Sequence, residues 1–191
     1  MVYLIGGSSH VGKTLLAQKL MERLKIPYLS LDHLKMGFIR TGMTELTVND
    51  DYKMRYWMWP FVAELIKTVC ENDQSLIIEG CYIPSEWRES FSPEYLAKIR
   101  CVFIVMSENY LRTNFDSVAG KASVIEHRID DRPDLERLIN CSVEFKNEAE
   151  RHGIPYIEIS DSFDLEKLAD ELISIFGAEK HIKGDGLNEN A

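Results

Sequence analysis

Residues 7–14 read Gly7-Ser8-Ser9-His10-Val11-Gly12-Lys13-Thr14, and this stretch decides the fold. Its two glycines allow the backbone to curl so that N–H groups point inward around an anion. The apolar run Val2–Ile5 before it predicts a buried strand, and leucines at helical spacing after it predict a helix. A helix N-terminus also favours an anion. The stretch therefore predicts a phosphate-binding turn between a strand and a helix.

The spacing Gly-x4-Gly-Lys-Thr matches the Walker A pattern, or P-loop, at every fixed position. In this pattern Lys13 reaches the β- and γ-phosphates of a nucleoside triphosphate, and the Thr14 hydroxyl can bind Mg²⁺. ATP and Mg²⁺ are therefore the expected cofactors. The alternative is a glycine turn before an ordinary helix. The residues expected to contact the nucleotide are Gly7, Ser8, Ser9, His10, Val11, Gly12, Lys13, Thr14 and Leu15.

The rest of the chain alternates apolar runs with segments of helical period. Five strands are expected, at 2–5, 28–31, 75–79, 101–106 and 154–159. Helices are expected at 15–24, 33–40, about 50–72, 95–98, 108–116, 133–152 and 164–176. Pro60 predicts a kink or break in the third of these. The alternation predicts an α/β fold, with a five-stranded parallel sheet covered by helices on both faces.

Length and composition set the domain organisation. A chain of 191 residues suits one domain, expected over 1–177, with an acceptor-binding insert at about 32–72 and a short lid at about 117–132. Residues 117–123 are small and polar, which predicts a loop. Residues 178–191 are polar and without period, so we expect a disordered tail.

Charge and cysteine content exclude several classes of protein. The net charge is −9 with no basic run, which argues against nucleic acid as the partner. No apolar stretch approaches the roughly 20 residues of a membrane span. The four cysteines are far apart and are expected to be reduced, in a cytoplasmic protein. A monomer or homodimer that acts on a small molecule is the expected form.

Other sequence segments narrow the kind of P-loop protein. The Asp-x-x-Gly and Asn-Lys-x-Asp segments of switch GTPases do not occur. A small-molecule kinase instead needs a carboxylate for the acceptor and cations that cover the phosphates. Asp32 and Glu79 each end a predicted strand, where ligands bind in parallel sheets. Glu79-Gly80 has the position from which an acid reaches Mg²⁺, so Thr14 and Glu79 are the metal candidates.

Asp32 is then the candidate for orienting or activating the acceptor hydroxyl, although either acid could simply cap the following segment. Lys35 and Arg40 follow Asp32 and can bind an anionic acceptor, with a solvated helix face as the alternative. The substrate-binding candidates are Asp32, Lys35, Arg40, Glu79 and Gly80.

Basic residues in and beside the expected lid are candidates for closing over the phosphates. Arg128 is the candidate catalytic arginine, and Arg112 is a candidate nucleotide ligand. Lys121, Arg132 and Arg137 are further candidates. Nearby acids supply the alternative, surface ion pairs on a helix.

With these motifs in place, the chain resembles the nucleoside monophosphate kinases, adenylate kinases in particular. His127-Arg128-Ile129-Asp130-Asp131 is similar to their Arg-x-Asp-Asp lid segment. Their Asp-Gly-Tyr-Pro-Arg acceptor segment is replaced by Glu79–Pro84, with Arg88 as a candidate substitute for its arginine. The Ile5–Ser9 and Ser30–Asp32 segments are also similar to uridine kinases and 2-phosphoglycerate kinases.

The resemblance implies the three-layer P-loop fold with strand order 2-3-1-4-5, and adenine beside the Ser160–Phe163 loop. We therefore expect an ATP-dependent phosphotransferase that moves the γ-phosphoryl group to a small acceptor, in the manner of adenylate and other nucleotide kinases. One alternative is a 2-phosphoglycerate or other small-metabolite kinase. Another is an ATP-binding regulatory module with little turnover.

Overall fold

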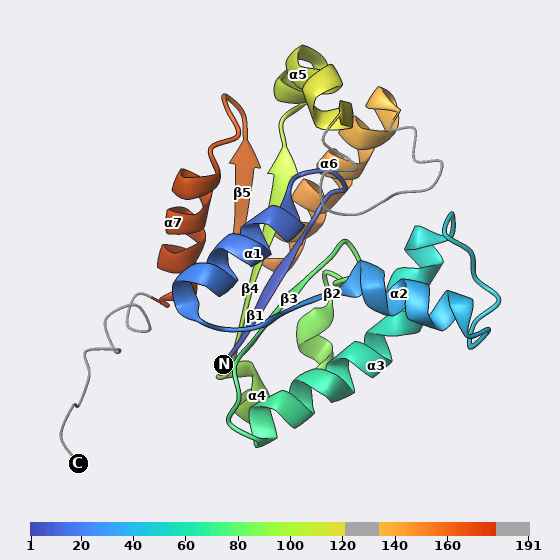
Figure 1. Cartoon of the computed structure of the whole chain (residues 1–191), viewed down its shortest axis with the longest axis vertical. Coiled ribbons are helices and arrows are strands. Elements are labelled where there is room, and N and C mark those ends of the chain that lie inside the picture. Colours follow the sequence, from blue (N-terminus) through green and yellow to red (C-terminus); the bar gives the residue numbers. More distant parts are fainter. Residues whose placement is uncertain (121–133, 179–191) are drawn as a thin grey trace.

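The computed structural model describes residues 1–120 and 134–178. Its sheet has five parallel strands in the order β2-β3-β1-β4-β5. This confirms the expected fold class and strand order (Figure 1). The strands are β1 (Val2–Gly7), β2 (Tyr28–Ser30), β3 (Leu76–Glu79), β4 (Ile99–Met106) and β5 (Tyr156–Ile159).

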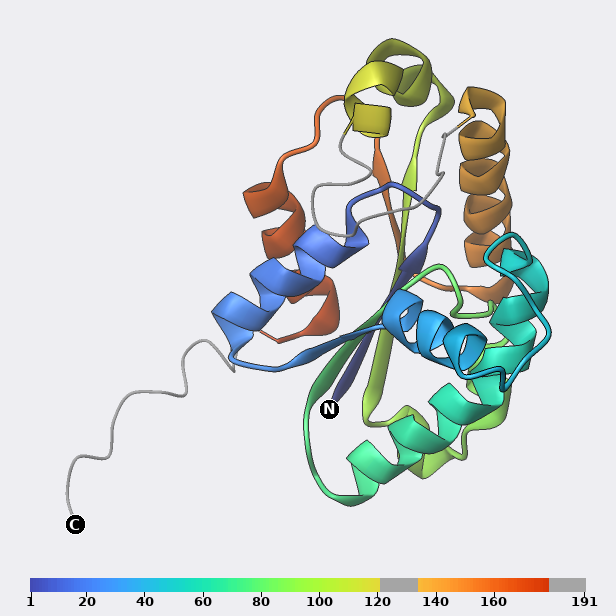
Figure 2. The same ribbon diagram turned by 45° about the vertical axis from the view of Figure 1, so that its right-hand side comes forward.

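Helices cover both faces of the sheet. In Figures 1 and 2, α1 and α7 lie on one face, and α3 and α6 lie on the other. The helices are α1 (Lys13–Leu24), α2 (Leu31–Arg40), α3 (Asp51–Glu71), α4 (Pro93–Leu96), α5 (Glu108–Gly120), α6 (Leu135–His152) and α7 (Leu165–Phe176), with a 3₁₀ turn, η1, at Trp87–Ser90.

The two faces of the sheet explain the unbroken apolar runs of the central strands. Alternate residues of a strand point to opposite faces, so Tyr3 and Ile5 join one core cluster while Val2 and Leu4 join the other. Because helices cover both clusters, every residue of β1 is buried. No helix in residues 1–120 or 134–178 is long and apolar enough to cross a bilayer.

The structure differs from the expected elements at three places. Asp32 was expected at the end of a strand, but β2 ends at Ser30 and Asp32 lies in the first turn of α2. Pro60 does not break α3, which is helical from Asp51 to Glu71. Pro60 is exposed, so water can bond the carbonyl that its missing N–H leaves without a donor. The segment 117–120 is helical rather than a loop, because α5 continues to Gly120 and Val118 is buried in the core. The remainder of the expected lid, and the tail from residue 179, lie outside the described residues.

Candidate active site

The P-loop connects β1 to α1 at the carboxyl edge of the sheet, as expected. Lys13 is buried, and its Nζ donates hydrogen bonds to the carbonyl oxygens of Ser8 at 2.6 Å and Gly7 at 3.3 Å. The Ser8 N–H donates to the Ile104 carbonyl at 3.0 Å, which joins the loop to β4. The ammonium group is thus held inside the curl that the motif predicts.

The loop after β5 packs directly against the P-loop. Gly12 has a φ of 85° and is the N-cap of α1. A Cβ atom at Gly12 would lie 2.7 Å from Cε2 of Phe163, so a side chain there would displace the Phe163 ring. The Ser160–Phe163 segment therefore borders the phosphate loop, on the side where the resemblance expects adenine.

Helix α6 supports the P-loop from the other side. The hydroxyl groups of Ser8 and Ser142 are 2.9 Å apart and share a hydrogen bond, and both residues are buried. Ser9 Oγ and His10 Nδ1 also share a hydrogen bond, at 2.8 Å. Burial raises the pKa of the Cys141 thiol, against the opposing effect of the Ser9 backbone N–H. Sequence reasoning missed Ser142 because no local pattern links it to the loop.

Thr14 and Glu79 meet, as their assignment to one metal site requires. Thr14 Oγ1 donates a hydrogen bond of 3.1 Å to Glu79 Oε1. The Glu79 side chain is buried at the carboxyl end of β3, which lies beside β1 in the sheet. A hydroxyl and a carboxylate oxygen are ligands of the kind that Mg²⁺ accepts.

Beside this pair, four polar side chains form a compact group that we call the acceptor cluster: Asp32, Lys35, Asp51 and Tyr82. Lys35 Nζ lies 3.3 Å from Asp32 Oδ1 and 3.4 Å from Asp51 Oδ1. The Tyr82 hydroxyl is 2.8 Å from Asp51 Oδ1 and 3.3 Å from Asp32 Oδ1, and Lys35 Nζ also donates to it. Helices α2 and α3 and the segment after β3 thus converge on one point.

The protonation states of the cluster follow from burial and charge. Burial alone would lower the pKa of Lys35, but the carboxylates of Asp32 and Asp51 outweigh it and raise that pKa above its ordinary value. Burial, with the neighbouring Cys81 and Asp32, raises the pKa of Tyr82. Near neutral pH, Lys35 is therefore a cation and Tyr82 a neutral hydroxyl.

Gly80 and Cys81 connect the metal candidates to the acceptor cluster. Gly80 has a φ of 153°, and a Cβ atom there would lie 2.8 Å from Leu31 Cβ, so β3 ends tightly against the start of α2. Arg55 Nε donates to the Cys81 carbonyl at 3.1 Å. Burial and the nearby Asp32 raise the pKa of Cys81 to about 12, so its thiol is protonated.

Of the other basic residues predicted to cover the phosphates, one reaches the acceptor cluster and one lies in surface ion pairs. Arg137 NH2 lies 3.5 Å from Asp51 Oδ2 and so reaches the acceptor cluster from α6. Arg112 pairs with Glu108 and Glu136, each at 2.9 Å. This matches the alternative expectation for Arg112, a surface ion pair on a helix. Lys121, Arg128 and Arg132 lie outside the described residues.

Two other basic residues lie apart from the cluster. Arg40 is five positions beyond Lys35 on α2, roughly 140° around the helix, and is exposed, so the two do not converge. Arg88 was wrongly considered as a substitute acceptor-site arginine. Its guanidinium group donates to the His152 and Gly153 carbonyls, at the amino edge of the sheet.

The cluster residues that sequence reasoning missed come from separate segments. Asp51 was expected only as part of the first turn of a helix, and neither it nor Arg55 was singled out as a site residue. Tyr82 lies in the segment that departs from the adenylate kinase pattern, and that departure was the one available signal. Only the folded chain brings Asp51 to Asp32, which lies on the preceding helix.

Comparisons with known proteins bear on the fold. No family model and no curated protein matches the chain. A gluconokinase from Sinorhizobium meliloti 1021 is 15% identical over 97% of each chain, with a TM-score of 0.57. A shikimate kinase from Aquifex aeolicus VF5 is 14% identical over 94% of this chain and 98% of its own, with a TM-score of 0.52.

A tunicamycin resistance protein from Deinococcus radiodurans is also similar. It is 14% identical, the match covers 92% of this chain and 95% of that one, and the TM-score is 0.58. At such identities the likeness shows the fold alone. It confirms the P-loop α/β fold that the Walker A segment predicts.

Proposed function

We propose that the protein is an ATP-dependent phosphotransferase that moves the γ-phosphoryl group to a hydroxyl of a small acceptor. The observation that carries this proposal is the position of the acceptor cluster beside the P-loop, at one edge of the sheet. Ser30 pairs with Glu79 between β2 and β3, so Asp32 begins a helix next to the Thr14–Glu79 pair. Acceptor, phosphates and metal ligands then lie together.

In this proposal each group has a distinct task. Lys13 binds the β- and γ-phosphate oxygens, and Thr14 and Glu79 hold Mg²⁺, which when bound neutralises charge on those oxygens. Asp32 orients the acceptor hydroxyl and takes its proton. The hydroxyl oxygen forms a bond to the γ-phosphorus, the bond from that phosphorus to the bridging oxygen breaks, and ADP leaves. Arg128 is proposed to stabilise the transferring group from the lid.

Charge balance at the cluster favours a neutral or singly charged acceptor over a phosphorylated one. Three cations at or beside the acceptor cluster each face an acid. Lys35 lies between Asp32 and Asp51, Arg55 NH1 is 3.7 Å from Glu144 Oε1, and Arg137 reaches Asp51. A phosphate dianion needs cations whose charge is not already matched. This favours a small-metabolite kinase over a nucleotide kinase.

The names of the similar structures point the same way. Gluconate and shikimate, the acceptors that those names imply, are hydroxylated acids with one carboxylate. We therefore propose a sugar or hydroxy acid as the acceptor. A nucleoside monophosphate or 2-phosphoglycerate is the second candidate. The resemblance of His127–Asp131 to the adenylate kinase lid supports the first, and the resemblance of Ser30–Asp32 to 2-phosphoglycerate kinases supports the second.

A coupled assay of ADP release tests the proposal. The acceptors to compare are neutral sugars, gluconate, shikimate, nucleoside monophosphates and 2-phosphoglycerate, each with ATP and Mg²⁺. We expect acceptor-dependent ADP release with a sugar or hydroxy acid, and none from the Lys13→Ala variant. Faster release with a phosphorylated acceptor would reject the charge argument but keep the kinase. Saturable ATP binding with no acceptor-dependent release would favour the regulatory module.

A further inference from the structure

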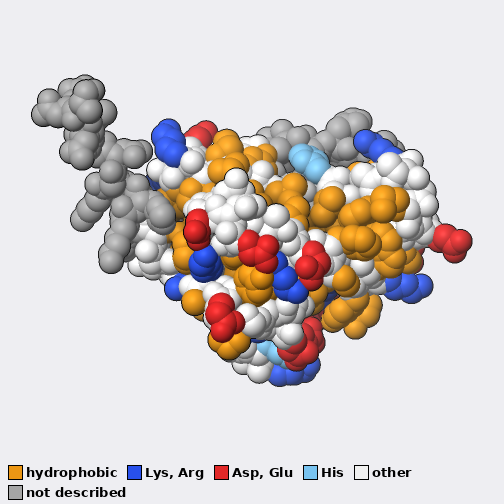
Figure 3. Space-filling model, turned by 90° about the horizontal axis from the view of Figure 1, so that it is seen from below, with side chains coloured by type: hydrophobic (Ala, Val, Ile, Leu, Met, Phe, Trp, Pro, Cys, Tyr) orange, Lys and Arg blue, Asp and Glu red, His pale blue; other side chains and the backbone are white. Residues whose placement is uncertain are grey.

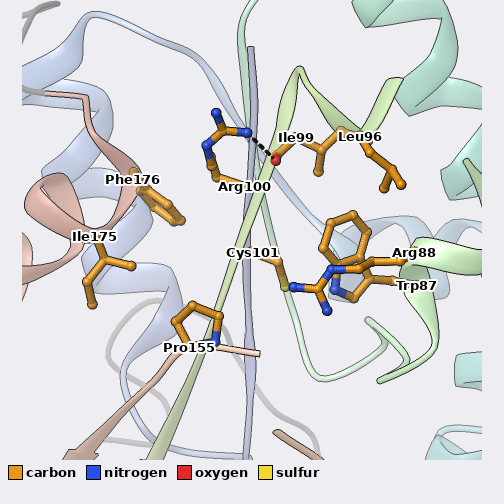
Figure 4. Close-up of a pocket in the computed structure, with 9 residues that line it drawn as sticks. All are labelled: Trp87, Arg88, Leu96, Ile99, Arg100, Cys101, Pro155, Ile175 and Phe176. Atoms are coloured by element: carbon orange, nitrogen blue, oxygen red, sulfur yellow. Dashed lines mark hydrogen bonds between the residues drawn. The ribbon is translucent and has the colours of Figure 1, made fainter. Parts of the chain in front are cut away.

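A cavity of about 260 Å³ lies at the amino edge of the sheet, at the opposite end of β4 from the P-loop. Its described lining contains two arginines, Arg88 and Arg100, and no acidic side chain. Figure 4 shows Trp87 and Arg88 on one side of the β4 ribbon and Arg100 and Phe176 on the other. The cavity therefore borders the edge of β4 rather than one face of the sheet.

The cavity lies here because β5, the neighbour of β4, begins only at Tyr156 and leaves the first residues of β4 without a paired strand on that side. Phe103 is the first β4 residue that pairs with β5, and its N–H donates to the Pro155 carbonyl at 2.9 Å. In a parallel ladder every second residue faces the same neighbour, so Cys101 faces the same way as Phe103. Pro155 has no N–H to give the Cys101 carbonyl, and the Cys101 N–H has no backbone partner among the described residues. The cavity lies where the missing strand residues would be.

The side chains around this gap offer hydrogen-bond donors. Trp87 is 3% exposed, and its Nε1–H has no partner in the described part of the chain. A buried donor without a partner is unfavourable, and a ligand acceptor would satisfy it. Arg88 lies over the Trp87 ring at 4.8 Å. Each guanidinium group has five N–H donors, so Arg88 and Arg100 retain donors beyond their bonds to backbone carbonyls.

We propose that this cavity is a second ligand site, which binds a small organic anion. A carboxylate or phosphate group would accept hydrogen bonds from Trp87 Nε1, the Cys101 N–H and the arginines. Its apolar body would pack against Pro155, Ile175 and Phe176. Figure 3 looks onto this edge of the molecule and shows acidic and basic side chains interspersed. The site is separate from the proposed phosphotransfer centre.

Nuclear magnetic resonance of the tryptophan indole groups in the full chain tests the proposal. The chain has three tryptophans, and Trp87→Phe identifies the Trp87 indole signal by its loss. The probes are benzoate, phenyl phosphate and benzyl alcohol, a neutral compound of similar size. We expect saturable movement of the Trp87 signal with benzoate, phenyl phosphate or both, and at least about tenfold weaker binding of benzyl alcohol. The anion that binds more tightly shows which charged group the site prefers.

One cavity variant and two control variants separate binding in the cavity from nonspecific binding. Arg100→Gln should weaken the binding of the preferred anion about tenfold, whereas Arg112→Gln, a surface arginine near the opposite edge, should leave it unchanged. Lys13→Ala should also leave it unchanged. If Arg100→Gln does not fold, Arg88→Lys replaces it, with the same loss expected. The proposal is overturned if neither anion moves the Trp87 signal, if benzyl alcohol binds equally well, or if the arginine variant binds as tightly as the original chain.

Discussion

The P-loop and the acceptor cluster lie at the same edge of the sheet but are built in opposite ways. The P-loop takes all its parts from eight consecutive residues, and its geometry follows from glycine and from the start of a helix. The acceptor cluster takes Asp32 and Lys35 from α2, Asp51 from α3 and Tyr82 from the segment after β3. A local motif can keep one chemistry across many proteins, whereas a group assembled from three segments can change its ligand through any one of them.

The largest effect is expected when the charge of the P-loop lysine is removed. We expect Lys13→Ala to lower the rate of ATP-dependent phosphotransfer by about 10³-fold or more, because no other described cation lies within the curl of the loop. Steady-state ADP release measures the effect. Lys19→Ala, on the same helix but paired with Glu166 on the surface, is the matched control and should keep nearly full activity. A Lys13→Ala rate within tenfold of the original would contradict the assignment.

The acceptor cluster should respond differently, since its residues lie outside the P-loop. We expect Asp32→Asn to reduce kcat about 10²-fold, because an amide cannot take the proton of the acceptor hydroxyl. The dissociation constant for ATP, measured by calorimetry, should stay the same. Asp73→Asn, at the amino edge of the sheet, serves as the control. Equal loss of ATP affinity in Asp32→Asn would place Asp32 in the nucleotide site instead.

A smaller change within the cluster tests whether the cluster binds the acceptor. Tyr82→Phe removes only the hydroxyl that lies between Asp32 and Asp51. Loss of one such hydrogen bond should raise KM for the acceptor about tenfold and leave KM for ATP unchanged. Tyr110→Phe, another buried tyrosine, is the control. If KM for the two substrates rises by the same factor, the effect of Tyr82 is on the fold of the site and not on acceptor binding.

The smallest effect is expected at Arg112, a predicted nucleotide ligand that pairs with two acids on the surface. Arg112→Gln should change KM for ATP by less than about twofold, since exposed ion pairs contribute little. The same ADP-release assay measures it, with Arg23→Gln, another paired surface arginine, alongside. A tenfold rise in KM would show that Arg112 leaves its partners to bind nucleotide.

The part of this architecture that sequence could predict is the part that short-range rules control. The apolar run of β1, the glycines of the P-loop and the end of β3 at Glu79 each have a local signature, so the sequence could predict the strands and the Thr14–Glu79 contact. Asp32 was expected at a strand end but lies in the first turn of α2. Strand order came from a resemblance, since local rules do not fix which strands are neighbours.

The rest depends on contacts that no local pattern encodes. Asp51 meets Tyr82 across 31 positions, and Ser8 meets Ser142 across 134. Arg88 shows the converse, that residues close in sequence can lie far apart in space. Because Arg88 is close to Glu79 in the sequence, it was a candidate for the acceptor site. The turn at η1 instead carries it to the other edge of the sheet. The extension of α5 to Gly120 likewise depends on burial of Val118, which its small, polar neighbours conceal.

The position of Lys13 has a consequence for the thermodynamics of nucleotide binding. Its ammonium group already bonds to two carbonyl oxygens of its own loop and is shielded from bulk water. Much of the dehydration of this cation therefore takes place when the chain folds, before any ligand arrives. When a phosphate binds, its oxygens would replace the loop carbonyl oxygens as the hydrogen-bond acceptors of Lys13. The phosphate oxygens differ from the carbonyl oxygens chiefly in their charge. The gain on binding nucleotide should then come from charge and not from additional hydrogen bonds to Lys13. Affinity for nucleotide should accordingly weaken as ionic strength rises.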